Sequence, residues 1–311
     1  MASPILHIKD SYYFEVPAFM WRHTYQSRDE VPAFLRDAHP HASPEDFNKA
    51  LDGKILIPQL PGVQLKNLYQ SDSPFAISKF MVIEVFVAIV IAFIFIRLAG
   101  LVRTGERPRG KFWNFFESML VFMRDEVARP AIGHHDGDKF LPLLWTLFFF
   151  ILGCNLLGLV PWAGSPTASF SVTLALAAVT LVTGAICGVV RFGPVGYLKN
   201  QIPHMDLPFV MAIVLKPAIW LIEVGGLFIK HGVLGVRLLA NMVAGHIVLL
   251  SIMGMAFSIE GALSPYWGLS AFFSVVGATA ISLLELFVAF LQAYVFVFLS
   301  SLFIGAAIHH H

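Results

Sequence analysis

Two apolar stretches in the C-terminal part of the sequence carry polar side chains whose types and spacing suit the movement of protons. The first, VRLLANMVAGH, contains Arg237, Asn241 and His246, and the second contains Glu285 and Gln292, which are seven residues apart and share a helical face. Arginine keeps its proton in proteins, so Arg237 can attract, repel or block a charge but cannot relay a proton. Glutamate and histidine can both exchange protons. The residues therefore combine a permanent cation with groups that pass protons.

Helical geometry places these groups on different sides. Arg237 and Asn241 share one face, whereas His246 follows Arg237 by nine residues and lies about 180° around the axis. Glu223 precedes Arg237 by fourteen residues, which is about 40° in projection and ~21 Å along the axis. Small residues beside the cation would let another helix approach closely, and these are Ala240, Ala244 and Gly245. The cation needs a moving carboxylate as its partner, and the sequence offers no second suitable acid, so a partner subunit is implied.

Composition predicts an all-α, polytopic membrane protein. Of its 311 residues, 57% are hydrophobic and only 13% are charged, against about 25% in soluble proteins. A charge near the bilayer centre costs roughly 2.5 to 3.5 kcal/mol, so Arg237 is expected to serve a purpose there. The net charge of +1 gives no indication of nucleic-acid binding, and no phosphate-binding loop is present, so any ATP chemistry is expected on other chains. Cys154 and Cys187 have no C-x-x-C partner, so we expect no metal site, and we expect no cofactor.

Long apolar runs predict about five to six membrane helices, because about 20 residues suffice to cross ~30 Å of hydrocarbon. The predicted helices cover about 80–98, 140–161, 170–190, 207–257 and 262–308. As a helix, the last run would span ~68 Å, about twice the hydrocarbon thickness. Either it breaks at Gly268 or Gly277, or it lies strongly tilted in a C-terminal helical hairpin.

Basic loops predict the orientation in the membrane. The loop RTGERPRGK places its end of the first helix in the cytoplasm, and Arg191 and Lys199 mark a second cytoplasmic loop. Residues 1–78, rich in proline and mixed in character, are then an extramembrane segment on the outside, and the C-terminus is cytoplasmic. An amphipathic helix over about 111–129, ended by Pro130, is expected on the membrane surface. The N-terminus does not resemble a signal or transit peptide, which favours a bacterial inner membrane.

Several residues keep a purely structural alternative. Arg237 and Glu285 could form an ion pair that holds two helices together, and His246 could be a core histidine. Three basic side chains could reach an interface or cap a helix break at Pro217 and Gly232, and these are Lys216, Lys230 and His231. Three hydroxyls could either bond to the backbone or line an outer water path, and these are Ser169, Ser171 and Thr173.

Three motifs together resemble subunit a of the F-type ATP synthase, the proton-conducting stator subunit of its membrane sector. They are CNLLGLVP at 154–161, IEVGGLFIKHGVLGVRLLANMVAGH at 222–246 and LLELFVAFLQAYVFVFLS at 283–300. The resemblance covers about 110–306. The arginine motif followed some forty residues later by E-x-x-x-x-x-x-Q-A-[YF] is highly specific to this family.

The resemblance implies roles for individual residues. Arg237 matches the essential arginine that faces the rotating ring of c subunits and meets each ring carboxylate. Asn241 and Gln292 match polar residues near that arginine, and His246 and Glu285 match a pair that exchanges protons. Glu223 matches an acid of the aqueous access route, and Lys230 falls on a position that is basic in some members. Ser169 and Ser171 stand where some bacterial members have an acid followed by an amide, and residues 1–78 have no match in short members of the family.

The implied function is proton translocation through two offset half-channels at the c-ring, which couples proton flow to rotation and to ATP synthesis. The implied partners are the c-ring subunits, b-type peripheral stalk subunits and the whole F1Fo complex, with membrane lipid around them. A sodium-translocating version of the same subunit is one alternative, since ring residues set the ion. A self-contained ion channel or transporter is another, but it would need inverted repeats or a second intramembrane carboxylate.

Overall fold

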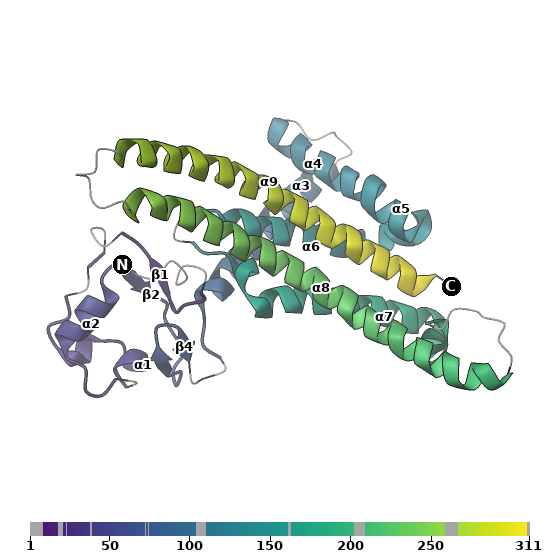
Figure 1. Cartoon of the computed structure of the whole chain (residues 1–311), viewed down its shortest axis with the longest axis horizontal. Helices are drawn as coiled ribbons and strands as arrows, with labels where there is room; N and C mark the ends of the chain where they lie inside the picture. Colours follow the sequence, from purple (N-terminus) through teal and green to yellow (C-terminus); the bar gives the residue numbers. More distant parts are fainter. Residues whose placement is uncertain are drawn as a thin grey trace. The chain divides into compact units, whose positions relative to one another are not determined.

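Long helices dominate the chain. The computed structural model describes residues 9–17, 21–22, 24–37, 39–71, 73, 75–103, 110–160, 163–201, 209–258 and 267–309. Within these residues, five helices are long and apolar enough to cross a membrane (Figure 1). They are α3 (Lys79–Arg103), α6 (His134–Gly158), α7 (Phe170–Asn200), α8 (Phe209–Ser258) and α9 (Trp267–Ile308). The predicted all-α, polytopic membrane fold is confirmed.

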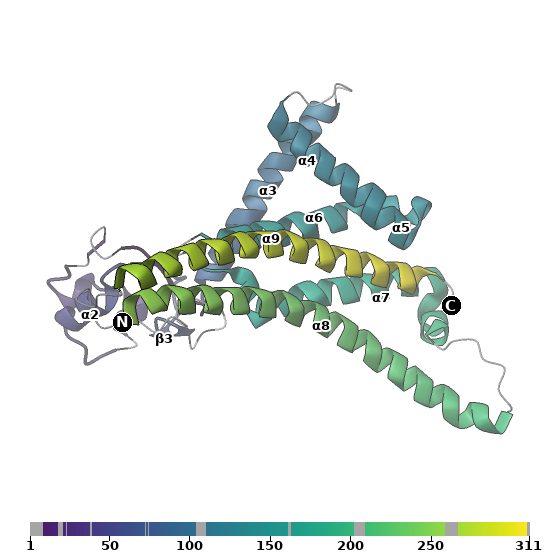
Figure 2. The same cartoon turned by 45° about the horizontal axis from the view of Figure 1, so that its top comes forward.

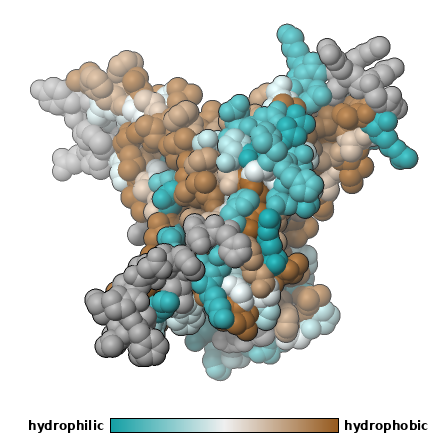
Figure 3. Space-filling view, turned by 90° about the vertical axis from the view of Figure 1, so that its right-hand side faces the viewer, coloured by the Kyte–Doolittle hydropathy of each residue, from teal (hydrophilic) through white to brown (hydrophobic). Residues whose placement is uncertain are grey.

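The chain divides into two compact units. Unit 1 consists of Met1–Val90, Gly153–Ser169 and Val243–Leu286, and unit 2 of Ile91–Leu152, Phe170–Met242 and Phe287–His311. Within each unit, the segments of α8 and α9 lie side by side in both Figure 1 and Figure 2. In unit 2, α8 diverges from α9 towards the N-terminal end of α8 (Figure 2). Hydrophilic side chains gather at the end where α9 finishes, bordered by hydrophobic surface (Figure 3).

The N-terminal part of unit 1 folds around a small core of its own. Strand β1 (Tyr13–Glu15) pairs antiparallel with β2 (Lys54–Leu56), and β3 (Leu65–Asn67) pairs with β4 (Gln70–Ser71). Three short helical segments lie between β1 and β2, namely η2 (Arg28–Glu30), α1 (Ala33–Arg36) and α2 (Pro44–Leu51). Their buried apolar residues form the core, which comprises Val31, Leu35, Phe47 and Leu51. The described residues of this segment, for which the sequence predicted no elements, therefore form strands and helices around a common core.

Ser43 caps α2, and its contribution to local stability can be tested. Ser43 Oγ accepts a hydrogen bond from the Asp46 N–H at 3.2 Å, and Asp46 Oδ2 accepts one from the Ser43 N–H at 3.0 Å. Because an N-cap serine satisfies an otherwise unpaired amide, Ser43→Ala should lower hydrogen-exchange protection of the α2 amides about fivefold. Ser27→Ala, at an N-cap without a side-chain bond, is the matched control and should leave η2 unchanged. Equal protection of α2 with and without Ser43 would contradict the assignment.

The same cap predicts an acid dependence. Its hydrogen bonds from Ser43 hold the pKa of Asp46 below the ordinary value. A lowered folded-state pKa contributes stability that is complete above the ordinary pKa and is lost as the pH falls through the lowered one. The protection factors of the α2 amides should therefore decrease below about pH 4, and this decrease should be weaker in Ser43→Ala.

The predicted surface helix does not end at Pro130. Helix α4 (Lys111–Phe122) continues into a π-helix, η3 (Met123–Ala128), and then into α5 (Arg129–Ile132). Pro130 lies near the start of α5, and the helical backbone runs through it, since Ala128 and Arg129 keep right-handed helical dihedrals. The helix ends at Gly133, whose φ of 100° favours glycine. Aromatic packing holds α4 against α3 and α6 within unit 2, since Phe116 lies 5.9 Å from Phe95 and 5.8 Å from Phe149, centroid to centroid.

Two helices extend beyond their predicted ends. Helix α7 continues ten residues past 190 to Asn200, so Arg191 and Lys199 lie in a helix and not in the predicted loop. The chain kinks at Gly193, with φ of 74°, and Pro194 then occupies the first turn of the following helical segment, where proline is tolerated. Helix α6 begins at His134, ahead of the predicted start at 140. Ion pairs of Asp136 with Lys139 at 2.8 Å and with Arg191 at 2.7 Å hold this polar first turn.

Helices α8 and α9 are each unbroken. Gly268 and Gly277 lie inside α9, whose 42 residues correspond to ~63 Å. Of the two alternatives, a break or a strong tilt, the break is absent. A strong tilt is therefore needed to keep the apolar length of α9 within ~30 Å of hydrocarbon. Pro217 and Gly232 likewise lie inside α8, so no basic side chain caps a break there.

Candidate functional site

Helix α8 directs Arg237 away from its buried face. That face is formed by Leu234, Leu238 and Met242, which recur every four residues and are at most 6% exposed. Arg237 lies outside this stripe, is exposed, and makes no ion pair with a described residue of unit 2. The guanidinium is therefore accessible from outside the unit.

One turn later, an amide pair joins α8 to α9 within unit 2. Asn241 Nδ2 donates to Gln292 Oε1 at 2.7 Å. Gln292 is buried, and its Nε2 has no hydrogen-bond partner among the described residues. The resemblance implied that both amides lie near the cation, but the bond between them was not predicted. The bond fixes the register of the two helices beside Arg237.

In unit 1, Glu285 lies directly against α8 at Gly245. Its Oε1 would overlap a Cβ at position 245, and its Cγ and Cδ would each lie 3.1 Å from that Cβ. The same Oε1 is buried and has no hydrogen-bond partner among the described residues. The close helix approach expected at the small residues is thus present. This close approach places Glu285 against Gly245, the residue immediately before the half-buried His246.

The serines at the start of α7 occupy different environments. Ser169 follows η4 (Pro166–Ala168), is half-buried and donates its N–H to Pro166 O at 2.9 Å, whereas Ser171 is exposed. Thr173 is buried, and its hydroxyl donates to Phe170 O at 3.3 Å. This bond agrees with the alternative in which these hydroxyls bond to the backbone. An outer water path along Ser169 and Ser171 stays a prediction.

A row of buried, hydrogen-bonded polar side chains near these serines was not predicted from the sequence. Thr167 Oγ1 donates to Asn155 Oδ1 at 2.7 Å, and Ser165 Oγ and Thr167 Oγ1 share a hydrogen bond of 2.8 Å. All three side chains are buried in unit 1. Asn155, at the second position of the CNLLGLVP motif, was the available signal, because a buried amide requires hydrogen-bond partners.

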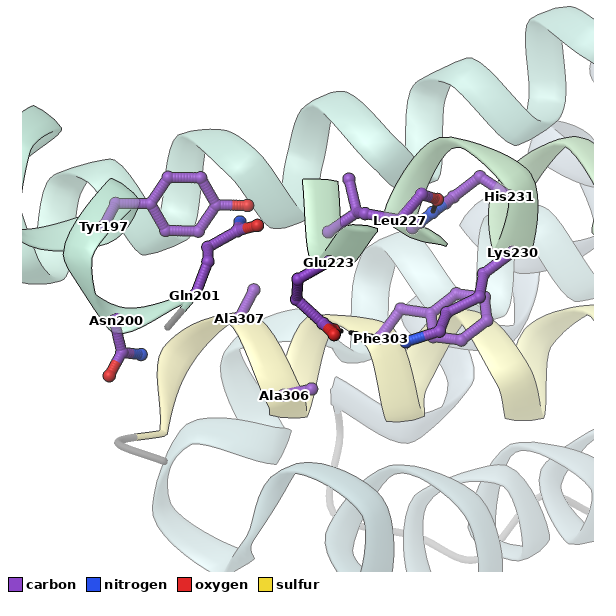
Figure 4. Close-up of a pocket in the computed structure, with 10 residues that line it drawn as sticks. All are labelled: Tyr197, Asn200, Gln201, Glu223, Leu227, Lys230, His231, Phe303, Ala306 and Ala307. Atoms are coloured by element: carbon purple, nitrogen blue, oxygen red, sulfur yellow. Dashed lines mark hydrogen bonds and ion pairs between the residues drawn. The ribbon is translucent and has the colours of Figure 1, made fainter. Parts of the chain in front are cut away.

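Glu223 lines a cavity of about 220 Å³ in unit 2. Figure 4 shows its lining from α7, α8 and α9. Glu223 Oε1 and Lys230 Nζ lie 3.4 Å apart across its mouth, and both side chains are about half exposed. Such an exposed pair contributes little to stability. His231 also lines the cavity but is buried, so its side chain does not extend to solvent as that of Lys230 does.

The fold and the site define a polytopic membrane protein with ionisable side chains on its two longest helices. The sequence matches the family described as ATP synthase A chain over residues 79–305. The chain belongs to this family. The match begins about thirty residues before the resemblance inferred from the motifs, and includes the whole of α3.

Several bacterial proteins named ATP synthase subunit a are similar to the chain. The protein from Anaeromyxobacter dehalogenans (strain 2CP-1) is 46% identical over 207 residues, which are 66% of this chain and 50% of that protein. The Myxococcus xanthus protein is 45% identical over 207 residues, covering 66% of this chain and 64% of its own length. The Anaeromyxobacter sp. (strain Fw109-5) protein is 36% identical over 316 residues, covering 98% of this chain and 70% of its own. The chain thus spans about half the length of the first of these relatives, and its N-terminal segment aligns with the last.

Proposed function

We propose that the chain conducts protons in the membrane sector of an F-type ATP synthase, at an interface with a ring of c subunits. The observation that carries the proposal is the exposed Arg237 beside the Asn241–Gln292 pair, in a chain of the ATP synthase A chain family. A permanent cation that forms no ion pair with a described residue of its own unit suits a carboxylate that arrives on another subunit and leaves again.

The proposed path has two offset halves. Protons enter from outside, pass near Glu285 and His246, and protonate a ring carboxylate. The ring then turns nearly a full circle before that carboxylate reaches Arg237 and releases its proton inward along the route past Glu223. Arg237 blocks a direct leak between the halves because it cannot exchange its own proton. Each proton crossing 100 mV releases about 2.3 kcal/mol, which drives rotation.

The proposal includes the surroundings of the chain. It lies in a bacterial inner membrane with the N-terminus outside and the C-terminus in the cytoplasm, and it contacts b-type peripheral stalk subunits in addition to the ring. The chain itself has no catalytic residue in this scheme, since ATP is made on other subunits of the F1Fo complex.

Ion dependence of the assembled complex tests the proposal. The whole complex, reconstituted in vesicles and energised by an acid-to-base jump in sodium-free buffer, should synthesise ATP, and a protonophore should stop the synthesis. The complex should also co-purify with a ring of small hairpin subunits. Synthesis that requires a sodium gradient would favour the sodium-translocating alternative, and ion flux through the isolated chain would favour a self-contained channel.

A further inference from the structure

His231 is a buried titratable group that the proposed path does not use. It is 5% exposed, and it lines the 220 Å³ cavity between α7, α8 and α9 (Figure 4). Its ring packs against Phe303 of α9, with centroids 4.6 Å apart and planes at 44°. The imidazole is therefore held in one orientation by a neighbouring helix.

One hydrogen bond fixes the tautomer of this ring. His231 Nδ1 lies 2.9 Å from the backbone oxygen of Leu227, one turn earlier in α8. A carbonyl oxygen can only accept, so Nδ1 carries the hydrogen and donates it. In the neutral ring Nε2 is then an unprotonated acceptor. That Nε2 is buried and has no hydrogen-bond partner among the described residues. A buried acceptor without a donor is costly unless water or a proton occupies it.

The charges around the cavity come from the same helix. Among its lining residues, Glu223 and Lys230 of α8 are the charged pair, Tyr197 of α7 is the other titratable group, and α9 contributes only Phe303, Ala306 and Ala307. Along α8, His231 lies ~12 Å beyond Glu223 and ~9 Å before Arg237. The imidazole thus stands between the acid at the mouth of the cavity and the permanent cation.

We propose that His231 Nε2 is a further proton-accepting site, which takes a proton from water inside the cavity and returns it to water on the Glu223 side. One N–H bond forms and later breaks, and the Nδ1–H bond to Leu227 persists in both states. The inference rests on the proposed proton conduction and adds an internal relay to its inward half.

His231→Asn tests the relay in the complete reconstituted complex. Asparagine can still donate to Leu227 O but cannot take up a proton. ATP-driven proton pumping should fall about tenfold or more, and the dependence of its rate on cytoplasmic-side pH should lose one titration step. His135→Asn, the same change at an exposed histidine of unit 2, is the matched control and should keep the wild-type profile. A His231→Asn profile that superimposes on wild type would overturn the proposal.

Two more variants separate proton transfer from packing. His231→Phe keeps an aromatic ring against Phe303, so wild-type pumping in this variant would show a packing role and overturn the relay. In His231→Ala, added imidazole should restore pumping, whereas pyrrole, which fills the same space without a basic nitrogen, should not. Equal rescue by both rings would also overturn it. Wild-type protein that conducts no protons would instead contradict the proposed function.

Discussion

Replacing Arg237 with alanine should abolish proton-driven ATP synthesis by the reconstituted complex. The exposed guanidinium cannot exchange its proton. In the proposed mechanism, its loss removes both the attraction for a ring carboxylate and the barrier between the half-channels. Synthesis should fall below detection, and passive proton conductance of the vesicles should rise. ATP yield after an acid-to-base jump and the decay of an imposed pH gradient measure the two effects.

Controls distinguish this role from a structural one. Arg97→Ala removes an exposed arginine from α3 of unit 2 and should leave synthesis intact. If Arg237 only formed an ion pair with Glu285, the double variant Arg237→Gln with Glu285→Gln would remove both charges and restore synthesis. We expect no restoration. Normal proton-driven synthesis in Arg237→Ala would sink the proposed function.

Gly245→Ala should strongly reduce proton flow while leaving the complex assembled. A methyl group at position 245 would overlap Oε1 of Glu285 and crowd its Cγ and Cδ, so the carboxyl must turn away from α8. Because the displaced atoms are the end of a flexible side chain, the effect on stability should be small and the effect on the position of the carboxyl large. Proton pumping driven by ATP, measured at equal amounts of assembled complex, should decrease at least tenfold.

A second substitution tests whether the carboxyl is the group displaced. Glu285→Asp shortens the side chain by one methylene and should partly restore pumping when combined with Gly245→Ala, although it impairs pumping alone. Gly254→Ala makes the same change further along α8, where a methyl group meets nothing within 4 Å, and should behave as wild type. Wild-type pumping in Gly245→Ala would show that the close approach of Glu285 to α8 is dispensable.

The faces of the helices were predictable because side-chain periodicity is a local property. The spacing of Arg237 and Asn241 placed both on one face, and the small residues around Gly245 predicted a close helix approach, which Glu285 makes. The length of the last apolar run likewise indicated a helix too long to stand upright.

Features that depend on a second helix were not predictable. The bond between Asn241 and Gln292 requires the relative register of α8 and α9, which no local pattern contains. The burial of His231 likewise depends on other helices, since Phe303 of α9 packs against its ring and α7 and α9 line the cavity beside it. The surface helix was expected to end at Pro130 because proline usually stops a helix. Helix α7 was expected to end at 190 because Arg191 and Lys199 were interpreted as part of a loop. The helical backbone instead continues through Pro130 into α5, and in α7 a second helical segment begins after the kink at Gly193.

The π-helix η3 has a consequence for how this family can change in length. A π-helical turn holds one residue more than an α-helical turn, so Met123–Ala128 has the form of a single-residue insertion absorbed without a loop. Deleting one residue there would turn Arg129 by about 100° relative to Asp125 and separate a pair now at 2.9 Å, together with the bond from Arg129 to Asp138. Alignments of relatives should therefore tolerate gaps in the loop before Lys111 more readily than between Met123 and Ala128.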